Sequence, residues 1–353
     1  MAEGSPALHA GPPLTQRLAE TPPWSPVRLA LAIAGALTAL LFAAEAIFER
    51  LPMLFGDSSA EWDVQSRVDF RISLVMILIV AYLPAAFAAG VRGARRAVED
   101  LRPFLRAGGD GSQLATAVGR FDPVVLRRAG IIGIGYGFLI PFWIDRTLAA
   151  WAIWNYTVEP IFQRFLLPAI GWFAGRFIYS VWAESRRLSA IGRDHVRVDL
   201  LDLRSFAPLT RQGLRYALLV VGLVSILALY LYDSDKRGLF TVVLIANAVA
   251  LAAAATALLL PLRGARQAIV AAKRRELDWC DAELRRARAA LESGPPAPGA
   301  VGDLVAWRGV VAGVQEWPLD APTLRRFVLY LGLPLGSWLG GAFVEHVVDI
   351  VLR

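Results

Sequence analysis

Long apolar runs are the feature that most constrains how this chain can fold. A transmembrane helix needs about 20 consecutive, mainly apolar residues, and seven runs of roughly that length recur along the sequence. The runs cover residues 29–48, 70–91, 129–150, 160–182, 213–232, 239–261 and 327–351. We therefore predict an all-α, polytopic integral membrane protein with seven transmembrane helices, whose first partner is the lipid bilayer.

The third and fourth runs leave one alternative open. Asp145 and Arg146 interrupt the third run, and its connection to the fourth run is short. A re-entrant hairpin over 129–182 would replace two full spans and leave five. The sequence favours seven spans and keeps the hairpin as the alternative.

Composition agrees with a membrane protein. Of the 353 residues, 56% are apolar and only 19% are charged, and the mean hydropathy is +0.49. Soluble proteins are about 45–50% apolar and about 25% charged. The formal net charge of +7 does not indicate nucleic-acid binding, because the arginines stand beside the apolar runs.

The residues that usually hold metals or perform catalysis are scarce. Cys280 is the only cysteine, so neither an internal disulfide nor a cysteine metal site is predicted. His9, His195 and His346 have no ligand spacing among them. No nucleotide-binding, metalloprotease or hydrolase motif occurs in a fitting context. We therefore predict no metal, no cofactor and no enzyme activity.

Arginine distribution predicts the orientation. The connections 92–128, 183–212 and 262–326 are rich in arginine, whereas 49–69 is acidic and 233–238 is very short. Basic residues accumulate on the cytoplasmic side of membrane proteins. We therefore predict a cytoplasmic N-terminus and an extracytoplasmic C-terminus. A composition rich in alanine, leucine, arginine and glycine, with only two lysines, favours the inner membrane of a bacterium.

Two halves of the chain resemble each other. VRGARRAV (91–98) and LRGARQAI (262–269) each follow an even-numbered run, and FDPVVLRR (121–128) and WPLDAPTLRR (317–326) each precede the next one. Same-direction copies form a parallel repeat, here three spans, one connector and three spans. We interpret the RGAR motif as an anchor at the membrane edge, with phosphate binding as the alternative.

The domain boundaries follow from this repeat. We predict a disordered cytoplasmic tail at 1–27, which is Pro-rich and lacks the pattern of a cleavable signal peptide. The remaining units are repeat A at 28–150, the fourth span with its connector at 151–212, and repeat B at 213–353.

The cytoplasmic region 262–326 belongs to repeat B. The second and sixth spans are predicted to continue past RGAR as amphipathic helices, because apolar residues keep a 3–4 spacing there. A linker at 293–299 and a short helix around 301–316 should follow. We expect these helices to pack within the chain, with oligomerisation through them as the alternative.

Several residues are candidates for a site. Ionisable groups within spans are costly and are therefore functional candidates. The predicted outer vestibule consists of Glu45, Asp145, Glu345 and Asp349. Arg176 is the deepest charge, and Asn247 is the main polar side chain of the sixth span.

Glycines at four-residue spacing predict close helix packing. The last run carries Gly332, Gly336 and Gly340, and the third and fourth runs carry further pairs. Those pairs are Gly133 with Gly137 and Gly171 with Gly175.

The predicted topology resembles that of the insect odorant and gustatory receptors. The shared features are an inside N-terminus, an outside C-terminus and long cytoplasmic connections after the fourth and sixth spans, here 183–212 and 262–326. The resemblance implies an oligomeric cation channel. It covers the spans in outline only, because SWLGGAFVEH (337–346) stands where that family has an aromatic–glutamine ending.

The leading functional hypothesis is an oligomeric pore-forming or transport protein for an unidentified ion or small solute, with its path near the third and seventh spans. The alternative is a non-catalytic sensor or scaffold that acts through 262–326. A membrane enzyme acting on lipid is the third hypothesis, and only Glu345, His346 and Asp349 could serve it.

Overall fold

The computed structural model describes residues 25–47, 61–106, 111–145, 158–229, 237–291, 300–318, 325 and 327–329. This part of the chain is helical and contains no strand, and its only β-pairing is an isolated bridge between Leu105 and Val196. The predicted all-α class is confirmed.

The helices follow one another along the chain with short connections. They are α2 (Pro26–Ile47), α4 (Glu61–Leu101), η1 (Arg102–Phe104), α5 (Gly111–Ala117), α6 (Pro123–Asp145), α7 (Val158–Asp194), η3 (Leu203–Phe206), α8 (Ala207–Ala228), α9 (Arg237–Leu291) and α10 (Ala300–Gly313).

Local sequence explains where these helices begin. Proline is favoured in the first turn of a helix because its missing N–H needs no partner there, and Pro26 and Pro123 open α2 and α6. The carboxylate of Asp122 accepts a hydrogen bond from the N–H of Val124 at 2.8 Å. This is an N-cap, which satisfies a backbone donor at the helix start.

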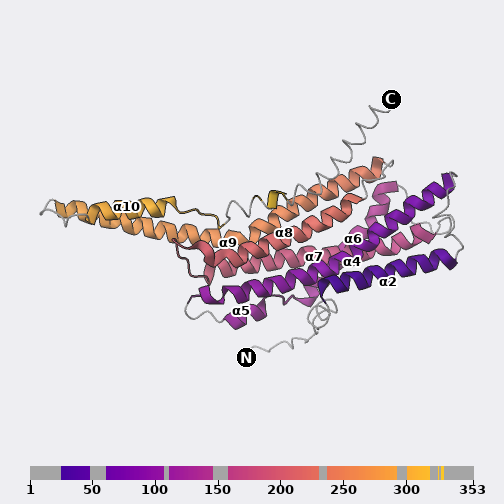
Figure 1. Ribbon diagram of the computed structural model, residues 1–353, viewed down its shortest axis with the longest axis horizontal. Coiled ribbons are helices and arrows are strands. Elements are labelled where there is room, and N and C mark those ends of the chain that lie inside the picture. The colour runs from indigo at the N-terminus through magenta and orange to yellow at the C-terminus, as the bar shows by residue number, and fades with distance from the viewer. Residues whose placement is uncertain are drawn as a thin grey trace, which may run out of the picture.

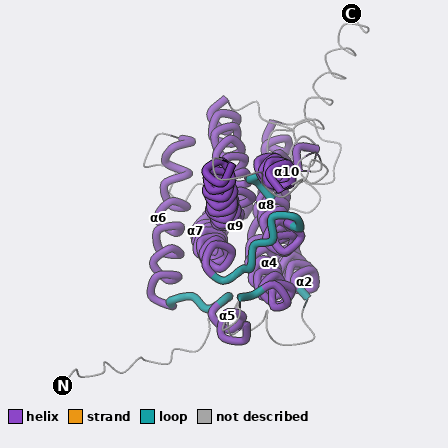
Figure 2. Tube along the Cα trace, turned by 90° about the vertical axis from the view of Figure 1, so that its left-hand side faces the viewer, coloured by secondary structure: helices purple, strands orange, loops and turns teal. Residues whose placement is uncertain are grey.

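The long helices run side by side along the long axis of the molecule (Figure 1). Helix α7 packs against α4, α6 and α9, and α8 packs against α4 and α9. Helices α6 and α2 lie on opposite sides of the bundle (Figure 2). The largest buried apolar cluster is formed mainly by α4, α7, α8 and α9.

Four of the described helical stretches are long and apolar enough to cross a membrane. They are Pro26–Ile47, Arg67–Phe104, Ile161–Asp194 and Leu203–Ala228. They coincide with the first, second, fourth and fifth predicted runs. Most of the third run lies in α6 and the sixth run lies in α9, while the last run lies almost wholly outside the described residues.

Both RGAR motifs lie inside continuous helices, as predicted. Helix α4 passes through the first motif and ends at Leu101. Helix α9 passes through the second and reaches Leu291, a length of 55 residues or about 80 Å. Its C-terminal part and α10 form a hairpin that projects beyond the bundle (Figure 1). The predicted short helix around 301–316 is confirmed as α10.

Glycine allows a close backbone contact between α6 and α7. A Cβ added to Gly133 would collide with the carbonyl oxygen of Gly171, and one added to Gly171 would collide with that of Gly133. The Cα of Gly175 faces the carbonyl of Ala129 in the same way. The prediction that these glycines allow close helix packing is confirmed, and the structure shows that the third and fourth runs pack against each other.

Candidate functional site

Arg176 lies inside the apolar stretch of α7 and is only 9% exposed. A helix that crosses lipid rarely carries such a charge, because the charged side chain is costly to insert. Sequence had marked Arg176 as the deepest ionisable residue. The structure shows which residues surround its side chain, and most of them belong to a second helix.

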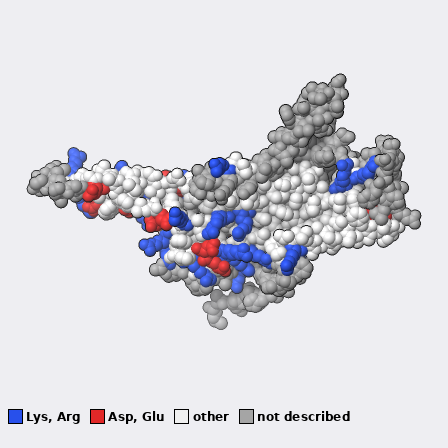
Figure 3. Space-filling model, in the orientation of Figure 1, with Lys and Arg blue, Asp and Glu red and all other residues white. Residues whose placement is uncertain are grey.

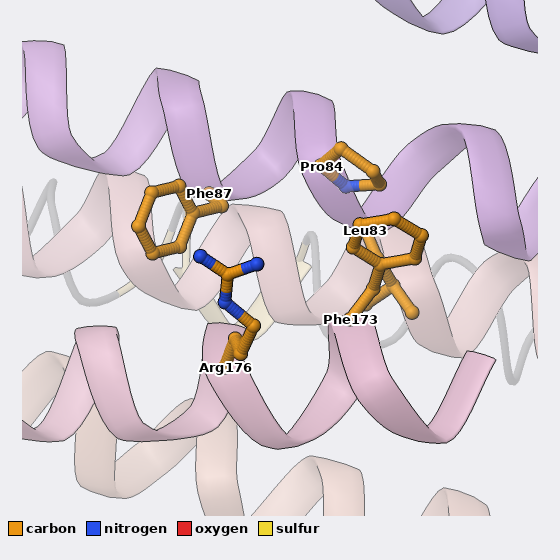
Figure 4. A pocket seen from close by; sticks show the side chains of 5 residues that line it. All are labelled: Leu83, Pro84, Phe87, Phe173 and Arg176. Atoms are coloured by element: carbon orange, nitrogen blue, oxygen red, sulfur yellow. The ribbon is translucent and has the colours of Figure 1, made fainter. Parts of the chain in front are cut away.

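The side chain of Arg176 crosses from α7 towards α4 (Figure 4). It lines a pocket of about 10 Å³ together with Leu83, Pro84 and Phe87 of α4 and Phe173 of α7. Arg176 is the only polar side chain of this lining. A cavity of this size has room for roughly one water-sized guest.

Trp172 holds the guanidinium within this layer. The guanidinium carbon of Arg176 lies 5.2 Å from the centre of the Trp172 ring, a cation–π contact. Trp172 stands one turn nearer the N-terminus of α7, on the side away from the later arginines of this helix. The contact therefore keeps the charge beside apolar residues.

Pro84 creates an irregular point in α4 at the same level. A proline inside a helix has no N–H to donate, so the carbonyl four residues earlier loses its usual partner. Pro84 lies within α4 and that carbonyl belongs to Val80. Such a site is tolerated in a membrane helix only where neighbouring groups compensate.

A second arginine–tryptophan pair on α7 provides an internal reference. Arg186 lies over the ring of Trp182 at 4.9 Å, with the same four-residue spacing as Arg176 and Trp172. Both side chains of this second pair are exposed. The two pairs share their chemistry and differ in their surroundings.

Charge on the described surface is unevenly distributed. Lysine, arginine and acidic side chains gather where the bundle meets the hairpin, a smaller group of lysine or arginine lies at the opposite end, and a broad uncharged surface lies between them (Figure 3). Large apolar side chains are exposed on the helices of that uncharged part, among them Leu31, Ile132, Phe165 and Ile178. Exposed apolar surface of this extent is typical of contact with lipid.

Sequence reasoning missed a buried acid at the charged end. Glu184 of α7 is 1% exposed, and its Oε1 accepts hydrogen bonds from the N–H of Gly119 at 2.9 Å and from Nη1 of Arg187 at 2.9 Å. Arg187 Nη1 also donates to the carbonyl of Arg120 at 2.5 Å. These contacts attach the turn between α5 and α6 to α7.

Gly119 has the backbone conformation that this turn requires. Its φ of +83° lies in the left-handed region, which glycine adopts without steric cost. A positive φ in this position explains why glycine stands at the end of α5. The Glu184–Arg187 spacing was the only local signal for the cluster, since their partners lie more than 60 residues away.

The glycines of the two RGAR motifs serve helix packing. A Cβ on Gly93 would collide with Gln212 and Arg215 of α8, and one on Gly264 would collide with the backbone of Ser189 in α7. Gln212 is itself buried and donates to the carbonyl of Gly90 at 3.1 Å. Both glycines therefore let neighbouring helices approach closely, while the membrane-edge anchor and phosphate binding at RGAR remain predictions.

The predicted vestibule residues are only partly covered by the structure. Glu45 lies near the end of α2 and is fully buried. Asp145 is the last residue of α6 and Asn247 lies in α9, but the side chains of both are outside the description. The other predicted residues lie outside the described part of the chain, namely Gly332, Gly336, Gly340, Glu345 and Asp349.

Comparison with known proteins returned no match. No family model, no curated protein and no solved structure matches the chain. Only the residues and their geometry bear on the function of the chain.

Proposed function

We propose that this chain is a multipass membrane protein that forms a pore or a transport path as a homo-oligomer, with the Arg176 site on or beside that path. One observation carries the proposal: a nearly buried guanidinium faces a small pocket within an apolar helix layer.

The free energies favour a functional role for this charge. An arginine costs about 2.5–3.5 kcal/mol at the centre of a membrane helix on insertion scales, and less at the position of Arg176, six residues before the end of the predicted span at 182. A cation–π contact returns only about 0.5–2 kcal/mol. An apolar residue in place of Arg176 would avoid this cost, so packing alone does not account for the arginine.

The topology that we propose has seven spans in a parallel 3+1+3 repeat. Helix α6 contains 23 residues, a length of about 35 Å, and the hydrocarbon core is about 30 Å thick. The part of α6 within 129–182 covers residues 129–145, about 25 Å; we propose two full spans there and keep the re-entrant hairpin as the alternative. Continuous helices through both RGAR motifs support the repeat. The likeness to insect odorant and gustatory receptors is proposed for the topology of the spans only.

The proposed orientation places the N-terminus and the α9–α10 hairpin in the cytoplasm. The C-terminus then lies on the outer side of the inner membrane. The charged end of the bundle (Figure 3) supports it. Two cysteine variants in a Cys280→Ser background test it. An impermeant maleimide should label Ser58→Cys in intact cells and Gly302→Cys only after permeabilisation, and the reverse result would overturn the orientation.

Reconstitution tests the function itself. Purified protein in liposomes should pass ions or small solutes, and Arg176→Gln should change the rate or the selectivity of that flux. Arg186→Gln is the matched control, because it removes the exposed member of the two arginine–tryptophan pairs. Absence of any flux across a range of ions, solutes and voltages would overturn the proposal.

A sensor or scaffold is the second candidate, and the hairpin favours it. The hairpin of α9 and α10 projects beyond the bundle (Figure 1), and Trp279, Val305 and Val310 are exposed on it. Exposed apolar side chains on a segment that projects from a bundle are typical of a protein contact.

Its test separates it from transport. Replacing Val305 and Val310 by Asp should abolish co-purification of a partner from the native membrane and leave the fold of the bundle intact. A chain that passes no ion or solute and loses its partner on this change is a scaffold. Unchanged co-purification would count against this second candidate.

A further inference from the structure

We infer that the Arg176 pocket is a binding site for a small monovalent inorganic anion of the halide class. The inference deepens the proposed function and rests on it, because it names the ion that the path would carry or respond to.

Charge is the first argument. Arg176 is the only ionisable residue that lines the pocket, and its four companions are apolar. The described residues place no carboxylate within ion-pair distance of Arg176. Glu184, the nearest described acid along α7, lies about 12 Å further along the helix and is bound to Gly119 and Arg187. The pocket therefore offers a positive charge to a guest.

Size is the second argument. A pocket of about 10 Å³ admits one guest comparable with a water molecule. Carboxylic acids, nucleotides and lipid headgroups are too large for it. A single halide ion fits this limit with a small adjustment of the flanking side chains.

The dry lining is the third argument, and it distinguishes between anions. Leu83, Phe87 and Phe173 supply no polar atom, so a guest must lose most of its hydration shell. A divalent anion such as sulfate pays a much larger desolvation cost than a halide. A guanidinium is itself weakly hydrated, and the edges of aromatic rings carry partial positive charge.

Thermal unfolding of the purified full-length protein in lipid nanodiscs tests the inference. Chloride should replace gluconate stepwise at constant ionic strength. A ligand that binds only the folded state raises Tm as its concentration increases, so Tm should rise with chloride and with bromide but not with sulfate. A Tm that does not change with halide concentration would overturn the inference.

Arg176→Gln should remove this dependence, or raise the chloride concentration at half effect by about tenfold or more. Arg186→Gln should retain it, because that arginine lies outside the pocket. Persistence of the full halide effect in Arg176→Gln would assign it to another site.

A variant that keeps the charge covers the case in which Arg176→Gln does not fold. Leu83→Ala enlarges the pocket, and the preferred halide should shift towards iodide. An unchanged order of halides in Leu83→Ala would count against this pocket as the site.

Flux measurements keep the two proposals apart. Flux that is cation-selective and independent of halide would overturn the anion site and leave the transport proposal standing. A halide-dependent Tm without any flux would support the anion site and overturn the transport proposal.

Discussion

The α6–α7 contact and the α9–α10 contact are held together in opposite ways. In the first, glycines bring backbone against backbone, as with Gly133 and Gly171. In the second, polar side chains connect the helices: Trp307 Nε1 donates to Glu276 at 3.0 Å, and Arg308 Nε donates to Asp281 at 2.7 Å.

The difference reflects the surroundings of the two contacts. Lipid chains are as apolar as leucine, so helices in a membrane gain little by burying apolar side chains and depend on close packing instead. The hairpin projects away from the bundle, where Cys280 and Val311 are buried between α9 and α10. Its partly exposed ion pairs contribute little free energy each.

The largest expected effect comes from Gly171→Leu. A leucine there would force α6 away from α7, and such overpacking against backbone belongs to the most destabilising changes, at about 4 kcal/mol or more. We expect a sharp loss of monodisperse protein in size-exclusion chromatography. Gly135→Leu is the control, because no atom lies within 4 Å of a Cβ at Gly135, and an equal loss there would contradict the packing argument.

Glu184→Ala should have the next largest effect. It removes the carboxylate that accepts from the N–H of Gly119 and from Nη1 of Arg187, at a cost of about 2–3 kcal/mol. Thermal unfolding should show a clear decrease in Tm. Asp194→Asn removes an exposed carboxylate of the same helix, whose solvent-screened ion pair with Arg193 contributes little to stability. A similar decrease in Tm in both variants would show that Glu184 does not stabilise the fold more than an exposed carboxylate does.

Trp307→Phe should loosen the hairpin without affecting the bundle. It keeps an aromatic ring and loses the hydrogen bond to Glu276, a change of about 1 kcal/mol. Cys280 reports the opening: its thiol is fully buried, and burial, together with the carboxylates of Glu276 and Asp281, raises its pKa. Alkylation of Cys280 should accelerate about fivefold.

The exposed ring of Trp279 gives the control for that experiment. Trp279→Phe changes an exposed tryptophan of the same hairpin and should leave the alkylation rate of Cys280 unchanged. Equal acceleration in both variants would show that the Trp307–Glu276 bond does not hold the hairpin closed.

The smallest expected effect has the opposite sign. Nothing lies within 4 Å of a Cβ at Gly309 in α10, so Gly309→Ala should stabilise the helix by about 0.5–1 kcal/mol. Slower hydrogen exchange of the α10 amides would reveal it. Faster exchange would indicate that this face of α10 is covered in the assembled protein.

Local sequence patterns were sufficient to predict most of the described helices. The apolar runs predicted the four stretches that can cross a membrane, and a 3–4 spacing predicted that α4 and α9 continue through RGAR. Asp122 and Pro123 mark the start of α6 in the sequence itself. These features depend on residues within a few turns of each other, so periodicity reveals them.

The candidate site was only half predictable. A lone arginine in an apolar run identifies Arg176 from sequence, because such a charge is costly wherever the helix lies. The pocket around it needs Leu83, Pro84 and Phe87, which lie about 90 residues earlier in the chain. No local pattern connects these residues to Arg176.

The sequence by itself determined the helical class, the apolar lengths and the position of the deepest charge, because each of these depends on residue type and spacing along one helix. Only the tertiary structure decided that Gly119 would bind Glu184, that Gly264 would face Ser189, and that Arg176 would have an uncharged pocket before it. Those pairings depend on which helices lie side by side, and contacts between distant segments are set by packing of the whole bundle.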